Sequence, residues 1–294
     1  MTSCPLRLFR WRSPPSSARF TSMAFLLPLC WIASSCGRSP QSPAAEQPQT
    51  LTLTGSSTGA PLVAEIGKQY EAQHPQVRVD VQTGGSSRGI ADVRSGVADI
   101  GLVSRDLTEA ETDLASFAVA RDGIGLIVHS RNPVKTLSDQ QIREIFRRQI
   151  TNWRQLGGQD APITVVNKAQ GRSTLELFES YFQFGPKDIK ADVVIGDNQQ
   201  GLKTVAANPH AIGYVSIGAA TVEIDRGEPI KLLPLEGVPA TLQTVQDGSF
   251  PLSRTLNLVT KGTPTPQARE FIEFATSPPM AATVKRQFFV PPES

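Results

Sequence analysis

Residues 51–59, Leu51-Thr-Leu-Thr-Gly-Ser-Ser-Thr-Gly59, contain the clearest signal of the fold class. Its first four residues alternate between apolar and polar side chains, as in a strand with one buried face. The glycines and hydroxyl residues that follow indicate a tight turn, and beyond it apolar residues recur at helical spacing: Leu62, Val63, Ile66 and Tyr70. A strand that passes through a turn into a helix is the basic unit of an α/β layer.

The same unit is repeated further along the chain. Residues 77–81 alternate as a second strand, residues 83–89 form a second turn into a helix, and residues 99–103 form a third strand. This order predicts an α/β fold with a mostly parallel sheet. Further strands are predicted at 125–129, 163–166, 193–195, 211–215 and 256–259, and further helices after Ser138, after the turn at 169–174 and around 271–274.

The basic character of the chain comes from its first 36 residues. The 294 residues include 29 Lys plus Arg and 27 Asp plus Glu, a formal net charge of +2. Arginines but no acidic residues precede residue 37, and so do the three cysteines, Cys4, Cys30 and Cys36. Without this segment the chain is slightly acidic, and its bases are spread out. It therefore lacks the one-sided basic stripe of a nucleic-acid-binding protein.

The first 36 residues are predicted to be a signal peptide. The apolar run at 23–33 has the length of a secretory hydrophobic region and is too short to span a bilayer. Small residues directly before Cys36 resemble a lipobox, so we expect lipidation at Cys36 and export to the periplasm or cell surface. An ordinary cleaved signal with an incidental cysteine is the alternative, and translation could begin at Met23. Residues 37–50 are polar and rich in proline, which predicts a flexible tether.

Three predicted strand-to-helix turns have the same chemistry. They are Gly55-Ser-Ser-Thr58, Gly85-Ser-Ser-Arg88 and Gly171-Arg-Ser-Thr174. Each places hydroxyl residues at the start of a helix, where unpaired backbone N–H groups and the helix dipole favour an anion. Ordinary N-capping would account for any one of them. Three in one α/β chain favour a shared anion site, with these cations as further candidates: Arg88, Arg105, Lys168 and Arg172.

In its motifs the chain resembles the phosphate-binding proteins of ABC importers. The resemblance rests on residues 53–61, 84–90, 98–105, 137–153, 169–174, 211–215 and 271–291, which follow one another in the family's order. It implies the type II periplasmic-binding fold, in which two α/β lobes with mostly parallel central sheets close on an anion in the cleft between them. We expect lobe 1 at 51–129 plus 251–294 and lobe 2 at 130–250. The resemblance also implies a monomeric, non-enzymatic receptor without a cofactor, which delivers phosphate to a membrane permease.

The resemblance assigns residues of the first two loops to the site. Thr58 resembles the family's first-loop hydroxyl, with Ser57 and the Gly59 amide beside it. Ser86 resembles the family's second-loop serine, with Ser87 next to it.

Elsewhere the chain departs from the family pattern. Ser104 and Arg105 fall where many members have Ser-Asp, and Lys168 falls where an arginine usually holds the anion. In the third loop Arg172 and Ser173 replace a Ser-Gly pair, while Thr174 matches the family threonine. An aspartate acceptor favours a protonated oxyanion, whereas an arginine favours one without a proton to donate. Phosphate is the predicted ligand, and sulfate, molybdate or tungstate are the alternatives.

Other functional classes have weaker support. Gly55-Ser-Ser-Thr-Gly59 also matches the nucleophile elbow of serine hydrolases, which would use Ser57 with Asp197 and His210. That elbow normally follows several strands, and here it follows the first one. The histidines lack metal-ligand spacing, and nucleotide-binding motifs do not occur. A tethered adhesin or signalling co-receptor with the same fold remains an alternative to transport.

Overall fold

The computed structural model describes residues 49–185 and 187–292. The predicted signal peptide at 1–36, the predicted lipidation site Cys36 and residues 37–48 of the predicted tether lie outside the described residues. The last two tether residues belong to the fold, because the first strand already begins at Gln49.

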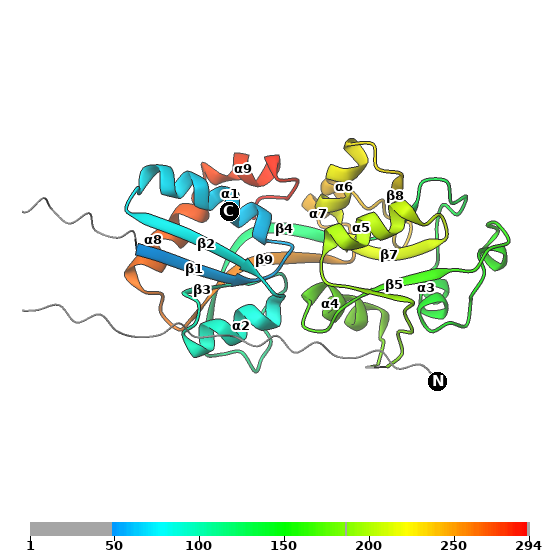
Figure 1. Cartoon of the computed structure of the whole chain (residues 1–294), viewed down its shortest axis with the longest axis horizontal. Coiled ribbons are helices and arrows are strands. Elements are labelled where there is room, and N and C mark those ends of the chain that lie inside the picture. Colours follow the sequence, from blue (N-terminus) through cyan, green and yellow to red (C-terminus); the bar gives the residue numbers. More distant parts are fainter. Residues whose placement is uncertain (1–48, 186, 293–294) are drawn as a thin grey trace, which may run out of the picture. The chain divides into compact units, whose positions relative to one another are not determined.

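A nine-stranded mixed sheet runs through the described residues (Figure 1). Its order is β2-β1-β3-β9-β4-β7-β5-β6, and β8 pairs with β4 off this path. The strands are β1 (Gln49–Gly55), β2 (Val77–Thr83), β3 (Ile100–Val103), β4 (Leu114–His129), β5 (Thr164–Lys168), β6 (Val193–Ile195), β7 (Ala211–Ser216), β8 (Ile230–Leu233) and β9 (Ser253–Lys261).

The sheet is less parallel than the sequence predicted. Strand β1 pairs in parallel with β2 and β3, and β5 pairs in parallel with β6 and β7. In the middle, β9 runs antiparallel to β3 and β4, and β4 runs antiparallel to β7 and β8. The reason is that β4 and β9 carry the chain along the sheet in opposite directions. They join the two parallel groups into one continuous sheet.

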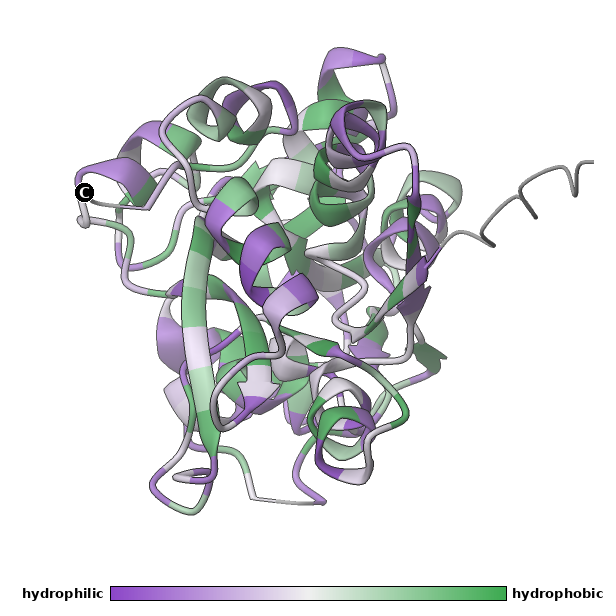
Figure 2. Cartoon of the chain, turned by 90° about the vertical axis from the view of Figure 1, so that its left-hand side faces the viewer, coloured by the Kyte–Doolittle hydropathy of each residue, from purple (hydrophilic) through white to green (hydrophobic). Residues whose placement is uncertain are grey.

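Helices lie on both faces of this sheet (Figure 1). They are α1 (Ala60–Gln73), α2 (Ser86–Ser95), α3 (Asp139–Phe146), α4 (Ser173–Phe182), α5 (Asn198–Ala207), α6 (Ile217–Asp225), α7 (Leu242–Gln246), α8 (Pro266–Ala275) and α9 (Met280–Arg286), with a 3₁₀ turn at Trp153–Leu156. Figure 2 shows hydrophilic and hydrophobic residues side by side along the helices, as expected for helices with one buried face. No helix among the described residues is both long enough and apolar enough to cross a membrane.

The apolar core is divided between the two parallel groups of strands. One large cluster includes Leu53, Ile66 and Phe271 around β1 and β3, and another surrounds β5 and β7. In the second cluster the Phe178 and Tyr214 rings stack with centroids 3.8 Å apart. Phe146 and Trp153 are buried in the same cluster.

Most predicted elements are present, and several others were missed. Ser138 caps α3 as predicted, with a reciprocal pair of hydrogen bonds to Gln141. The predicted strand at 125–129 is only the end of β4, whose first half contains small and charged residues that break the apolar pattern. Helices α5, α6, α7 and α9 and strand β8 were not predicted.

Candidate anion-binding site

The starts of four helices meet in one buried hydrogen-bond network. Ser86 at the start of α2 shares a hydrogen bond of 2.7 Å with Ser173 at the start of α4. Thr58, two residues before α1, accepts a hydrogen bond of 3.1 Å from Asn198, the first residue of α5. Each of these side chains is less than 9% exposed. Backbone N–H groups of helix starts and hydroxyl groups therefore gather at one place, although they come from distant parts of the sequence.

The first turn is organised by Ser56. Its hydroxyl oxygen accepts hydrogen bonds from the N–H groups of Thr58 and Gly59, at 3.2 and 3.4 Å, and shares one with Ser104. Gly55 permits this turn because its φ is +135° and a Cβ there would collide with the Leu102 carbonyl. Sequence reasoning named Ser57 and passed over Ser56, because the motif alone does not say which of two adjacent serines is turned inward.

The second and third turns approach each other closely. Gly85 has a φ of +101°, and a Cβ there would collide with the Gly171 carbonyl. That carbonyl accepts a hydrogen bond of 3.4 Å from the Ser87 N–H group. The Ser86 hydroxyl also accepts one of 3.1 Å from the Ser104 N–H group. The small residues of these turns allow the two helix starts to come together.

Arg254 on β9 is the cation at the centre of the network. Its side chain is 1% exposed, and its Nε and Nη2 donate to Oδ2 of Asp122 at 3.1 and 2.8 Å. Its Nη1 donates to the Thr174 hydroxyl at 2.8 Å, and its Nη2 lies 3.3 Å from the Thr58 hydroxyl. Sequence reasoning missed both Arg254 and Asp122, since each lies within a strand and outside any motif.

Asp122 is held by groups other than Arg254 as well. Its Oδ1 accepts hydrogen bonds from the Ser216 hydroxyl at 3.0 Å and the Gly218 N–H group at 3.4 Å. Both carboxylate oxygens are thus occupied. The carboxylate fixes the guanidinium of Arg254 and leaves one edge of it directed at the hydroxyl groups.

Lys168 at the end of β5 adds a second buried cationic side chain. It is 3% exposed, and its Nζ donates to Asn198 Oδ1 at 2.9 Å. Burial and, to a smaller extent, the positive charges of Arg254 and Arg172 lower the pKa of Lys168 to about 7, although Asp197 acts in the opposite direction. The ammonium form therefore lacks the stabilisation that a paired anion would provide.

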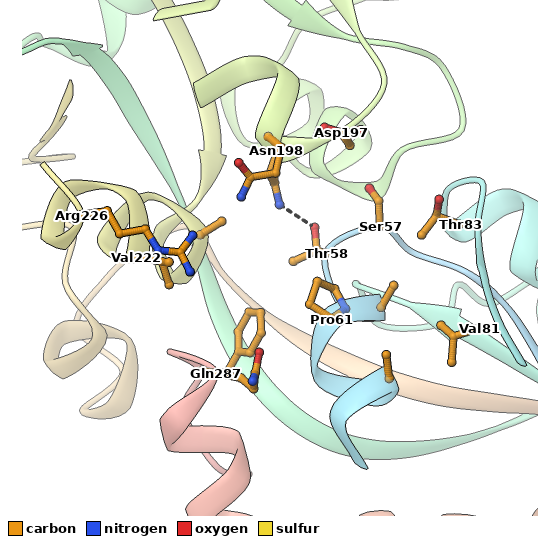
Figure 3. A pocket seen from close by; sticks show the side chains of 15 residues that line it. Ser57, Thr58, Pro61, Val81, Thr83, Asp197, Asn198, Val222, Arg226 and Gln287 are labelled. Atoms are coloured by element: carbon orange, nitrogen blue, oxygen red, sulfur yellow. Dashed lines mark hydrogen bonds between the residues drawn. The ribbon is translucent and has the colours of Figure 1, made fainter. Parts of the chain in front are cut away.

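The structure brings together six of the residues predicted for the site. These are Thr58, Ser86, Ser104, Lys168, Ser173 and Thr174. The Gly59 N–H group is directed at Ser56. Ser57 is half-buried and lines a neighbouring cavity of about 560 Å³ with Pro61, Val222 and Arg226 (Figure 3).

The contacts of the other predicted cations, Arg88, Arg105 and Arg172, do not connect them to this network. Arg105 donates to Glu111 at 2.8 and 2.9 Å and to Glu176 at 2.8 Å. Arg88 is exposed and pairs with Asp92 at 3.1 Å. Ser87 donates to Glu176 at 3.0 Å, and the buried Nε of Arg172 has no hydrogen-bond partner within the described chain.

The network is suited to a small oxyanion. Hydroxyl donors, helix starts and two buried cationic side chains are the groups that bind tetrahedral anions in proteins. Among the described residues, no cluster of His, Cys, Asp and Glu could hold a metal ion. The hydrolase alternative is not supported by the positions of its residues. Ser57 and Asp197 line the large cavity, whereas His210 lines another of about 200 Å³ with Arg131 and Gln159.

Comparisons with known proteins agree with this chemistry. The PBP superfamily domain matches residues 41–279. The phosphate-binding protein PstS of Bacillus subtilis is 28% identical over 87% of each chain. The solved structure of a phosphate ABC transporter substrate-binding protein from Clostridium perfringens, with bound phosphate, is 30% identical at a TM-score of 0.77; the match covers 83% of this chain and all of the other. An ABC-type phosphate transport receptor from Vibrio cholerae is 31% identical, over 82% of this chain and all of the other, with a TM-score of 0.69.

Proposed function

The chain belongs to the PstS family of phosphate-binding proteins within the PBP superfamily, and from this premise we propose that it is the extracytoplasmic receptor of a phosphate ABC transporter. Like the other proteins of this family, it binds its ligand and does not catalyse a reaction. The observation that carries the proposal is the meeting of Thr58, Ser86 and Thr174 with Arg254 in one buried network. Phosphate would replace the hydrogen bonds that these side chains now form with one another.

The experiment is a calorimetric titration of the protein with phosphate, sulfate, molybdate and tungstate. We expect phosphate to bind most tightly, because a protonated oxyanion can both accept and donate in a network of hydroxyl groups. Tighter binding of another of the four anions would redirect the proposal to that ligand. Absence of binding to all four would refute it.

We place a hinge where β4 changes its partners. Residues 114–123 of β4 pair with β9, whereas residues 124–129 pair with β7 and β8. The Ile124 N–H group donates to the Leu252 carbonyl at 2.9 Å, beside the start of β9. This exchange supports a two-lobe arrangement whose crossovers lie at residues 123–124 and 252–253, before the boundary at 129 that the sequence predicted.

Closure of the lobes on the anion is part of the proposal. The Ser86–Ser173 and Arg105–Glu176 contacts both join one proposed lobe to the other. If the lobes open without ligand, small-angle X-ray scattering should give a smaller radius of gyration with phosphate than without it. Sodium chloride at equal ionic strength is the control.

Lipid attachment at Cys36 would hold the receptor at the membrane that carries its permease. Mass spectrometry of the membrane-bound protein should find an acylated N-terminal cysteine, and Cys36→Ser should release the protein into the soluble fraction. An unmodified, soluble wild-type protein would show that 1–36 is an ordinary cleaved signal.

A further inference from the structure

The amine of Lys168 is buried among cations without a carboxylate of its own. Its only hydrogen-bond partner within the described chain is Oδ1 of Asn198, at 2.9 Å. The same oxygen lies 3.4 Å from the Ser216 N–H group, so its capacity is shared. Arg254, by contrast, has Asp122 at 2.8 Å. Of these two side chains, Lys168 is the one without a carboxylate in contact among the described residues.

The charged groups around Lys168 come from three elements. Arg254 approaches from β9 and Arg172 from the residue before α4, and both oppose a positive charge on the amine. Asp197, before α5, favours the charge, but its carboxylate caps α5 by accepting from the Gln200 N–H group at 2.8 Å. The balance lowers the pKa of Lys168 to about 7.

The network also lacks a carboxylate that could accept a proton from the ligand. Both oxygens of Asp122 are occupied by Arg254, Ser216 and Gly218. Glu111 and Glu176, the carboxylates near Ser104, are each bound to the guanidinium of Arg105. A neutral amine has a lone pair and is the strongest base left in the network.

We propose that Lys168 determines the anion specificity of the site through its own protonation. As a neutral amine it accepts the hydrogen bond of a monohydrogen oxyanion such as HPO₄²⁻, and as an ammonium ion it also admits an oxyanion without a proton, such as sulfate. The inference rests on the proposed function, because it concerns the anion that occupies this network. It assigns to Lys168 the role of the missing carboxylate acceptor.

The sign of the pH dependence follows from this assignment. Sulfate binding requires the ammonium form of Lys168. Sulfate affinity is therefore highest below the pKa of Lys168 in the ligand-free protein, and above that pKa it falls by roughly tenfold for each pH unit. Monohydrogen phosphate binds the neutral form, so its affinity holds above that pKa. The ratio of phosphate to sulfate affinity therefore rises by roughly tenfold per unit between about pH 7.5 and about pH 9.

The test is calorimetry with inorganic phosphate and sodium sulfate between about pH 6 and about pH 9, on wild type and Lys168→Arg. Arginine remains charged throughout this range, so the variant should lose most of the pH dependence of the ratio. Lys203→Arg, an exposed lysine on α5, is the matched control and should behave like wild type. Thermal unfolding of each variant shows that the fold is retained.

Proton counting gives an independent readout. Titrations of wild type in two buffers of different ionisation enthalpy should show, at about pH 8, uptake of nearly one proton with sulfate and much less with phosphate.

Three outcomes would overturn the inference: a constant affinity ratio in wild type, the same pH profile in Lys168→Arg, or no sulfate binding at about pH 6. Failure of phosphate to bind at any pH would instead refute the proposed function.

Discussion

Arg254 and Arg105 are two largely buried arginines, of which Arg254 belongs to the network and Arg105 does not. The donors of Arg105 are used by carboxylates: Glu111 accepts from Nη1 and Nη2, and Glu176 accepts from Nε. Arg254 has one carboxylate partner, Asp122, so its Nη1 is directed at the Thr174 hydroxyl. The comparison teaches that an arginine is available to an anion only where carboxylates leave part of its guanidinium free.

The largest effect should come from removing the buried arginine. Arg254→Met leaves Asp122 buried without its cation, which should reduce the free energy of unfolding by about 3–5 kcal/mol. Phosphate affinity should fall as well, by roughly 10- to 100-fold, because hydrogen bonds to charged groups contribute about 1.5–3 kcal/mol.

Urea unfolding and calorimetry measure the two effects of Arg254→Met. Arg269→Met, on the exposed face of α8, is the matched control and should change stability by less than about 0.5 kcal/mol. If the two variants were equally stable and bound phosphate equally well, Arg254 would not be the central cation.

A smaller effect is expected at Glu111, which acts on stability and not on the ligand. Arg105 lowers the pKa of Glu111 to about 2 from the usual 4.5. Because the folded-state pKa is depressed, the stabilisation is complete above about pH 4.5 and is lost as the pH falls towards 2. Glu111→Gln should therefore reduce stability at neutral pH and flatten its decline between those values. An unchanged acid-unfolding curve, followed by circular dichroism, would contradict this.

The smallest effect of the three is expected at Glu176. Its carboxylate is 32% exposed, and exposed ion pairs contribute at most about 1 kcal/mol. Glu176→Gln should weaken phosphate binding by no more than about fivefold, mainly through faster dissociation if the contact holds the lobes closed. Arg88→Ala removes an exposed pair outside the network and is the control. A loss of phosphate affinity above tenfold in stopped-flow and equilibrium measurements would place Arg105 and Glu176 within the binding site.

The sequence predicted the helix starts of the site because their chemistry is local. Gly55, Gly85 and Gly171 mark turns, and Thr58, Ser86 and Thr174 follow them within the same turns. These residues converge in the structure, and their role as ligands stays a prediction. The turns at 83–89 and 169–174 were predicted to open helices, and α2 and α4 do begin there.

What the sequence did not predict depends on contacts between distant segments. Asp122 and Arg254 come from β4 and β9 and meet only because these strands pair in antiparallel register. Arg105 was a candidate ligand because it follows Ser104. In the structure its guanidinium pairs with Glu176, which is far away in the sequence. Asn198 follows Asp197 in a polar stretch that has no apolar period, so α5 was missed together with the residue that binds Lys168.

The central claim is that hydroxyl groups at separate helix starts bind one phosphate ion together. The most direct measurement is the phosphate affinity of wild type and of Ser86→Ala/Thr174→Ala by calorimetry. Each neutral hydrogen bond contributes about 0.5–1.5 kcal/mol, so the double variant should bind at least about fivefold more weakly while it still unfolds cooperatively in urea. An affinity equal to that of wild type, in a folded double variant, would contradict the account.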